Sequence, residues 1–133
     1  RRKLDEHGHP ASVVKVVNVY PEVISCGPLK VSYLPISHSI PESAGLLIDT
    51  PEGRVLHSGD FKIDETPVVG DPWNEALWEE VSKDGVKALV CDSTNVFSHT
   101  PGRSEASIGD AIADMMRAAG GMVVATTFAS NTS

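Results

Sequence analysis

The sequence is poor in cysteine and aromatic residues, and it has no long apolar run. Two cysteines, Cys26 and Cys91, are too few for the disulfide framework of a small secreted protein. We therefore predict two free thiols in a reducing cytoplasm, with Cys91 buried inside an apolar run. No apolar stretch approaches the ~20 residues that a membrane-spanning helix needs, and no signal peptide is recognisable. We expect a cytoplasmic protein without a membrane anchor.

Basic residues are also scarce. Lys and Arg total 11 against 18 Asp and Glu, which gives a formal net charge of −7. No basic stripe stands out, so the field of the chain alone would repel a phosphate backbone. This argument against nucleic-acid binding fails if divalent metals occupy a site, because two Zn²⁺ ions add four local positive charges.

What the sequence does have is the composition of a globular domain, with 41% hydrophobic and 22% charged residues over 133 positions. A domain near this size buries roughly two-thirds of its unfolded surface, so a sizeable core is possible. The chain opens at Arg1 without a methionine and stops at Ser133. We expect it to be an interior piece of a longer protein.

Hydrophobic periodicity predicts an α/β fold (an α+β mixed sheet). Alternating or β-branched runs indicate strands at residues 13–20, 29–36, 44–49, 54–58, 86–91 and 122–127. Pro51 and Gly53 suit a type I turn between the third and fourth strands. The run at 86–91 is typical of a buried parallel strand.

Apolar residues at helical spacing indicate two helices. Asp71 is the expected cap of the first, which should end just before Gly85. Ser104 is the expected cap of the second, which should end at Gly120.

Three polar clusters follow predicted strands, where α/β proteins place their functional loops. They are residues 37–43 with His38, 57–64 with Asp60, and 92–95 with Asp92. Imidazole and carboxylate side chains can ligate a metal there. Taken alone, each cluster is better explained without a metal: the first by a hydrogen-bonded loop histidine, the second by a turn with a capping aspartate, and the third by an Asx-turn with capping.

The remaining histidines add little to these clusters. His57 lies within a strand, with Leu56 and Ser58 on the other face, and is predicted to be structural. His7, His9 and His99 stand in polar stretches without paired spacing. The sequence has no HExxH, HxxEH, P-loop, GxSxG or GxGxxG motif. One histidine and two aspartates are also fewer nitrogen ligands than zinc hydrolase sites usually have.

Four short motifs occur in a fixed order along the chain. They are His38-Ser39-Ile40-Pro41-Glu42-Ser43, Gly59-Asp60-Phe61-Lys62-Ile63-Asp64, Asp92-Ser93-Thr94-Asn95 and Thr127-Phe128-Ala129-Ser130-Asn131. Together they resemble ribonuclease J, of the β-CASP branch of the metallo-β-lactamase superfamily, from about Val13 onward. The resemblance implies part of a metallo-β-lactamase αββα sandwich over residues 1–92, running into the start of a β-CASP domain over 93–133.

The resemblance also implies roles for the matching residues. His38 resembles a metal-binding histidine and Asp60 the aspartate that bridges two zinc ions, so both are catalytic candidates. Asp92 resembles the acidic first motif of the β-CASP branch, which supports the site by hydrogen bonding. Ser39 and Ser43 flank the metal histidine and are candidates for orienting it.

The implied activity is that of a zinc-dependent ribonuclease with two Zn²⁺ ions per site. In such a site the metals lower the pKa of bound water from ~15.7 to about 7, and the resulting hydroxide attacks the RNA phosphodiester. Ser130 and Asn131 lie in a stretch that resembles the entrance to the domain covering the RNA channel. The intact enzyme is expected to be a homo-oligomer.

The family's HxHxDH signature is missing from the sequence and is expected before Arg1, with further β-CASP histidines after Ser133. We therefore predict that this piece is inactive by itself. Two other functions stay open. One is a metallo-β-lactamase-type hydrolase of a thioester or lactam, against which the βαβ extension after Asp92 argues. The other is a non-catalytic interaction module, which the net charge and the missing ligands favour.

Overall fold

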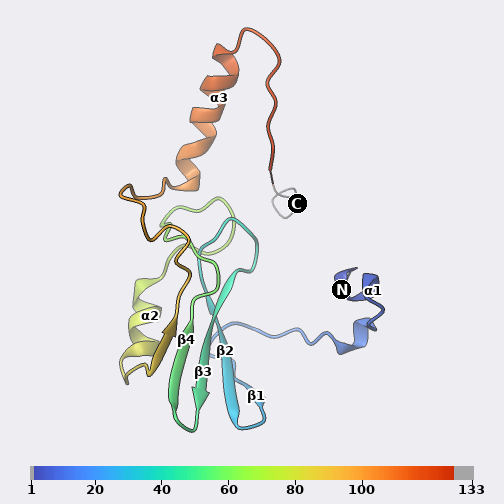
Figure 1. Cartoon of the computed structure of the whole chain (residues 1–133), viewed down its shortest axis with the longest axis vertical. Helices are drawn as coiled ribbons and strands as arrows, with labels where there is room; N and C mark the ends of the chain where they lie inside the picture. The colour runs from blue at the N-terminus through green and yellow to red at the C-terminus, as the bar shows by residue number, and fades with distance from the viewer. Residues whose placement is uncertain (1, 128–133) are drawn as a thin grey trace.

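The computed structural model in Figure 1 describes residues 2–127. It contains three α-helices, two short 3-10 helices and five strands among those residues, so the predicted α/β class with a mixed sheet is confirmed. In chain order the elements are α1 (Arg2–Glu6), η1 (Ala11–Val13), β1 (Ile24–Cys26), β2 (Leu29–Pro35), β3 (Ala44–Thr50), β4 (Gly53–His57), α2 (Glu75–Ser82), β5 (Ala88–Val90), η2 (Glu105–Ser107) and α3 (Ile108–Ala118).

The sheet has the strand order β1-β2-β3-β4-β5. The first three neighbouring pairs are antiparallel, and β4 and β5 are parallel. Strands β2, β4 and β5 therefore run in the same direction, and their carboxyl ends lie at one edge of the sheet. We call this the carboxyl edge. The two hairpin turns lie at the opposite end, as Figure 1 shows.

The core lies between the sheet and α2. Its buried side chains come from three neighbouring strands and the helix: Leu34, Leu47, Leu56 and Val81. Trp78 of α2 packs against this cluster. A Cβ atom built on Gly45 would lie 2.9 Å from the His57 carbonyl oxygen and 3.0 Å from the Trp78 ring. Glycine at position 45 is thus what lets the helix approach the sheet so closely.

The two outermost predicted strands are wrong. Val13 is the last residue of η1, residues 14–20 form an irregular segment, and residues 122–127 carry no strand. Val16 is 80% exposed and Met122 is 91% exposed. A β-branched run becomes a strand only where it pairs with a neighbour along its length. The Tyr20 N–H donates to the Tyr33 carbonyl oxygen of β2 at 2.7 Å, but this contact is not continued into a ladder.

The expected burial of the strand at 86–91 is also wrong. The parallel pairing of β5 with β4 is confirmed, but β5 is an exposed edge strand in which Leu89 is 61% exposed. Cys91 is exposed for the same reason, contrary to expectation, although both cysteines are free thiols as predicted.

The helix starts differ from those predicted. Helix α2 begins at Glu75 rather than near Asp71, because the Asn74 side chain accepts the Leu77 N–H at 3.1 Å. Its end before Gly85 is confirmed, and Gly85 has a φ of +92°. Ser104 precedes η2 but makes no side-chain cap hydrogen bond. That hydroxyl contacts Thr66 instead, at a distant point of the chain.

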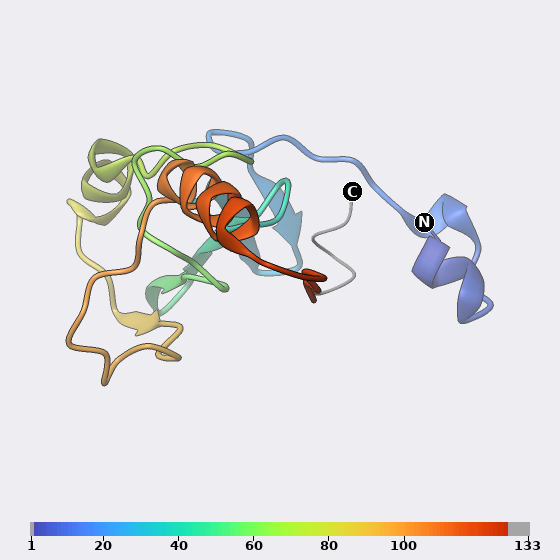
Figure 2. The same ribbon diagram turned by 90° about the horizontal axis from the view of Figure 1, so that it is seen from above.

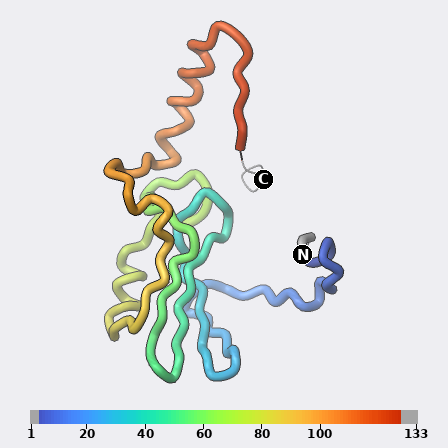
Figure 3. Tube along the Cα trace, in the orientation of Figure 1, coloured from blue at the N-terminus to red at the C-terminus, as the bar shows by residue number. Residues whose placement is uncertain are grey.

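Two segments stand away from the sheet. The N-terminal segment with α1 lies to one side, and α3 extends beyond the carboxyl edge before the chain turns back beside it (Figures 1, 2 and 3). We call residues 108–127 the α3 arm. No described residue of α3 is buried. Within residues 2–127, no helix has the length and apolar character needed to cross a membrane.

Candidate functional site

The sheet topology brings the three predicted polar clusters to one place. Residues 37–43 follow β2, residues 58–64 follow β4, and residues 92–95 follow β5. Because these three strands run in the same direction, all three loops leave the sheet at the carboxyl edge. Ser43, immediately before β3, also lies there since β3 runs the opposite way.

Ser37 joins the first loop to the second. This serine is completely buried, and its carbonyl oxygen accepts the Lys62 N–H at 2.8 Å. Its hydroxyl donates to the Lys62 carbonyl oxygen and accepts the Asp64 N–H at 3.2 Å. The residue next to His38 is therefore fixed to the loop that carries Asp60.

Ser58 joins the second loop to the third. Its N–H donates to the Val90 carbonyl oxygen at 2.9 Å, which continues the parallel pairing of β4 and β5. The Ser58 hydroxyl accepts the Asp92 N–H at 2.9 Å and donates to the Gly59 carbonyl oxygen at 2.7 Å. The backbone of Asp92 is thus held against the start of the loop that carries Asp60.

Gly59 turns the chain into position for Asp60. It has a φ of +63°, and a Cβ atom there would lie 3.0 Å from the Ala44 carbonyl oxygen. Both features favour glycine. The Gly59 N–H donates to His57 Nδ1 at 2.9 Å, and the Ser43 hydroxyl contacts the Asp60 carbonyl oxygen at 3.5 Å. The Asp60 side chain is exposed, so it is accessible to a ligand.

His38 and Asp92 lie close enough to interact electrostatically. Hydrogen bonds from the hydroxyl and N–H of Thr94 lower the pKa of Asp92, and the Phe61 N–H and His38 act in the same direction. Burial opposes them. His38 Nδ1 is buried and has no hydrogen-bond partner among the described residues. Such an atom costs free energy unless a ligand or another group satisfies it.

The predicted site residues are therefore brought together in part. His38 and Asp92 interact, and Ser43 contacts the backbone of Asp60, while Ser39 is exposed. Ser130 and Asn131 lie outside the described residues. An imidazole and carboxylates suit zinc, but residues 2–127 contain no group of three or more His, Cys, Asp or Glu side chains that could hold a metal ion. The described donor set can supply only part of a zinc site.

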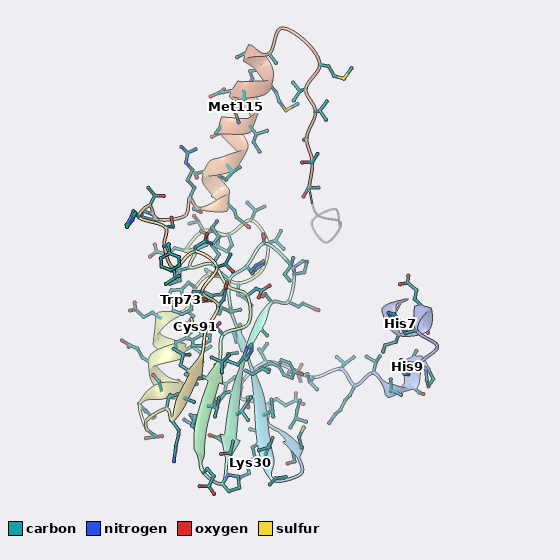
Figure 4. The ribbon with its side chains drawn as sticks, in the orientation of Figure 1. His7, His9, Lys30, Trp73, Cys91 and Met115 are labelled. Atoms are coloured by element: carbon teal, nitrogen blue, oxygen red, sulfur yellow. The ribbon has the colours of Figure 1, made fainter. Side chains whose placement is uncertain are left out.

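The other histidines lie elsewhere or act locally. Figure 4 places His7 and His9 on the N-terminal segment, apart from the sheet. His57 is exposed while Leu56 and Ser58 are buried, as predicted from the strand alternation, and its ring accepts the Gly59 N–H.

Sequence reasoning missed the residues that hold the loops together. Ser37, Ser58 and Asp64 are 0%, 5% and 5% exposed, and all three make hydrogen bonds between loops. For Ser37 and Ser58, the available signal was a small polar residue soon after an apolar strand, because such a position is buried and its hydroxyl must find a partner. The partners themselves are 25–41 residues away in sequence, so no local pattern could identify them.

Comparison with known proteins gives a consistent answer. No family model matches the chain. It is 41% identical over 108 residues to "Ribonuclease J" of Sinorhizobium meliloti, covering 81% of this chain and 19% of that protein. It is 36% identical over 132 residues to "Ribonuclease J 1" of Streptococcus pyogenes, covering 98% and 23%, and 39% identical over 131 residues to "Ribonuclease J" of Helicobacter pylori, covering 97% and 19%.

The chain thus spans about a fifth of the length of the curated relatives it matches. The similarity is spread over most of the chain and recurs in several bacteria. Over the aligned residues, this chain belongs to the ribonuclease J family.

Proposed function

We propose that this chain is a segment of a metal-dependent ribonuclease that hydrolyses RNA phosphodiesters with the help of zinc. The observation that supports this most directly is that the loops carrying His38, Asp60 and Asp92 leave the sheet at the same carboxyl edge, in a chain whose relatives are named ribonuclease J. Residues 1–92 would belong to a metallo-β-lactamase domain and residues 93–133 to the start of a β-CASP region. The intact protein would act in the cytoplasm as a homo-oligomer.

His38 and Asp60 are the proposed metal ligands. The buried and unpartnered Nδ1 atom of His38 favours this role, because a metal would satisfy its lone pair. The exposed carboxylate of Asp60 is free to bridge two ions. Bound divalent metals would supply Lewis acidity and a lowered water pKa. The remaining ligands would come from parts of the protein outside this chain.

Asp92 would act by positioning. Its carboxylate is held by Thr94 and Phe61 and interacts with His38, so it stays ionised and favours a fixed imidazole orientation. Ser39 and Ser43 would support the same loop. Ser130 and Asn131 would lie near the RNA, as the resemblance implies.

The test uses the full-length protein that carries this sequence. Asp60→Asn and His38→Ala should each abolish cleavage of a labelled single-stranded RNA and lower the zinc content measured by mass spectrometry. Asp92→Asn should keep the zinc and lose about 10–100-fold in rate. Asp71→Asn and His99→Ala, at exposed positions, are the matched controls and should change neither readout.

Different outcomes separate the alternatives. If Asp60→Asn retains both zinc and cleavage, the proposed bridging role is wrong. If the wild-type protein hydrolyses a thioester or a lactam but not RNA, the other hydrolase function is correct. If it binds no metal and hydrolyses none of these substrates, it is a non-catalytic module. The 133-residue chain alone should bind zinc weakly, and tight stoichiometric binding with RNA cleavage would contradict the incomplete site.

A further inference from the structure

Asp64 is a buried carboxylate that the proposed function does not use. It is 5% exposed and lies four residues after Asp60. Its carboxylate accepts the Glu105 N–H at 2.9 Å and the Thr66 N–H at 3.0 Å, and it pairs with Lys62 Nζ at 3.0 Å. Burying a carboxylate costs free energy, and several hydrogen-bond donors are needed to offset that cost.

The hydrogen bonds between residues 64–68 and residues 104–105 run in both directions. While Asp64 accepts the Glu105 N–H, the Glu105 carboxylate accepts the Val68 N–H at 3.0 Å. The Ser104 hydroxyl donates to the Thr66 carbonyl oxygen at 2.9 Å, and its oxygen lies 2.6 Å from Thr66 Oγ1. We call these five residues, Asp64, Thr66, Val68, Ser104 and Glu105, the clasp.

Asp64 of the clasp is also hydrogen-bonded to the loop that carries His38. The Asp64 N–H donates to the hydroxyl of buried Ser37, the residue before His38. The Lys62 N–H donates to the Ser37 carbonyl oxygen. A continuous set of hydrogen bonds therefore leads from the neighbour of His38, through Asp64, to the turn that begins the α3 arm.

The α3 arm depends on this attachment more than an ordinary helix would. No residue of α3 is buried, and Ile112 and Met115 are 46% and 65% exposed. Figure 4 shows Met115 on a helix that extends beyond the sheet. Since the arm gains no orientation from a packed apolar face within residues 2–127, the hydrogen bonds at its base set its direction.

We propose that Asp64 is a positioning residue that fixes the base of the α3 arm to the loop carrying Asp60, and so orients the arm relative to the carboxyl edge. The carboxylate is needed because it must satisfy two N–H donors and an ammonium group at once, which a neutral amide cannot do. The orienting role of Asp64 does not depend on the proposed function, whereas the effect of Asp64 on RNA cleavage rests on that function.

The first experiment measures the clasp directly, by site-resolved hydrogen exchange in the full-length protein. Asp64→Asn should speed exchange at the Glu105 and Thr66 amides by about 10-fold, the effect of losing hydrogen bonds to a charged acceptor. The Thr94 amide, which Asp92 holds at 2.8 Å, is the internal control and should not change. Unchanged exchange at Glu105 overturns the proposal whether or not the protein cleaves RNA.

The second experiment tests positioning by rescue. Thr66→Cys with Ser104→Cys places two thiols where two hydroxyl oxygens lie 2.6 Å apart, in a background in which Cys26 and Cys91 are replaced by serine. Asp64→Asn should retain zinc but lower kcat for RNA cleavage, and the oxidised cross-link should restore kcat while the reduced form should not.

Two results of the rescue would overturn the positioning role. One is an unchanged kcat in Asp64→Asn. The other is a lowered kcat that the cross-link fails to restore, which would mean that the carboxylate acts at the site itself. If the wild-type protein cleaves no RNA, the proposed function fails, and the exchange measurement still decides whether the clasp holds the arm.

Discussion

The sheet and the α3 arm have similar apolar content but very different surroundings. In the sheet, Leu34 is completely buried and Leu56 is 5% exposed, with α2 covering them. In the arm, Met115 is 65% exposed and Val124 is 77% exposed. An exposed apolar face of this kind is typical of a surface that contacts another part of a protein or a partner. We infer from this difference in burial that packing stabilises the sheet, whereas polar contacts at its base stabilise the arm.

The largest difference between the two regions is expected from truncating one apolar side chain in each. Leu34→Ala should lower the free energy of unfolding of the 133-residue chain by about 2–5 kcal/mol, because it leaves a cavity in the core. Ile112→Ala in α3 should cost under about 1 kcal/mol, since Ile112 is 46% exposed. Urea unfolding followed by circular dichroism measures both. Equal losses would mean that the arm packs as tightly as the sheet.

A smaller difference is expected between Gly59, in the loop that follows β4, and Gly120 in the arm. Gly59→Ala should cost about 1–3 kcal/mol, because φ is +63° and the new Cβ would lie 3.0 Å from the Ala44 carbonyl oxygen. Gly120, beyond α3, has open space around it, so Gly120→Ala should be neutral or slightly stabilising. The same urea titration measures both changes. A neutral Gly59→Ala would show that the turn before Asp60 is not constrained as described.

The sequence predicted strands β2, β3 and β4 better than it predicted the runs at 13–20 and 122–127, for a physical reason. Strands β2, β3 and β4 pair with neighbours adjacent in sequence, so alternation and the turn around Gly53 were enough to predict them. The runs at 13–20 and 122–127 have similar composition, but their fate depends on partners that sequence alone does not supply.

The candidate site shows the same limit. His38, Asp60 and Asp92 could be selected because each follows an apolar strand, and the parallel direction of those strands brings them to one edge. The serines that hold the loops together were not predicted, because Ser37 and Ser58 find their partners across the fold. Pairings over such sequence distances are a property of the tertiary structure.

A third effect is expected from pH, because protonation of Asp64 removes a charge from the clasp. The nearby Ser104 hydroxyl and then the Glu105 N–H lower the pKa of Asp64 well below its ordinary value of 3.8, with Lys62 and Thr66 acting in the same direction and burial opposing them. A folded-state pKa below the unfolded value means that ionised Asp64 stabilises the fold fully above about pH 5, and that this contribution is lost as pH falls below 3.8.

The stability difference between the wild-type chain and Asp64→Asn should therefore be greatest and constant above about pH 5, and it should shrink progressively as pH falls below 3.8. Urea unfolding at a series of pH values measures it. Asp71→Asn is the matched control, because this aspartate is exposed and outside the clasp, and its difference from wild type should stay small throughout. A difference at Asp64 that stays constant with pH would mean that the carboxylate's charge contributes nothing. The arm would then be held by hydrogen bonds that an amide provides equally well.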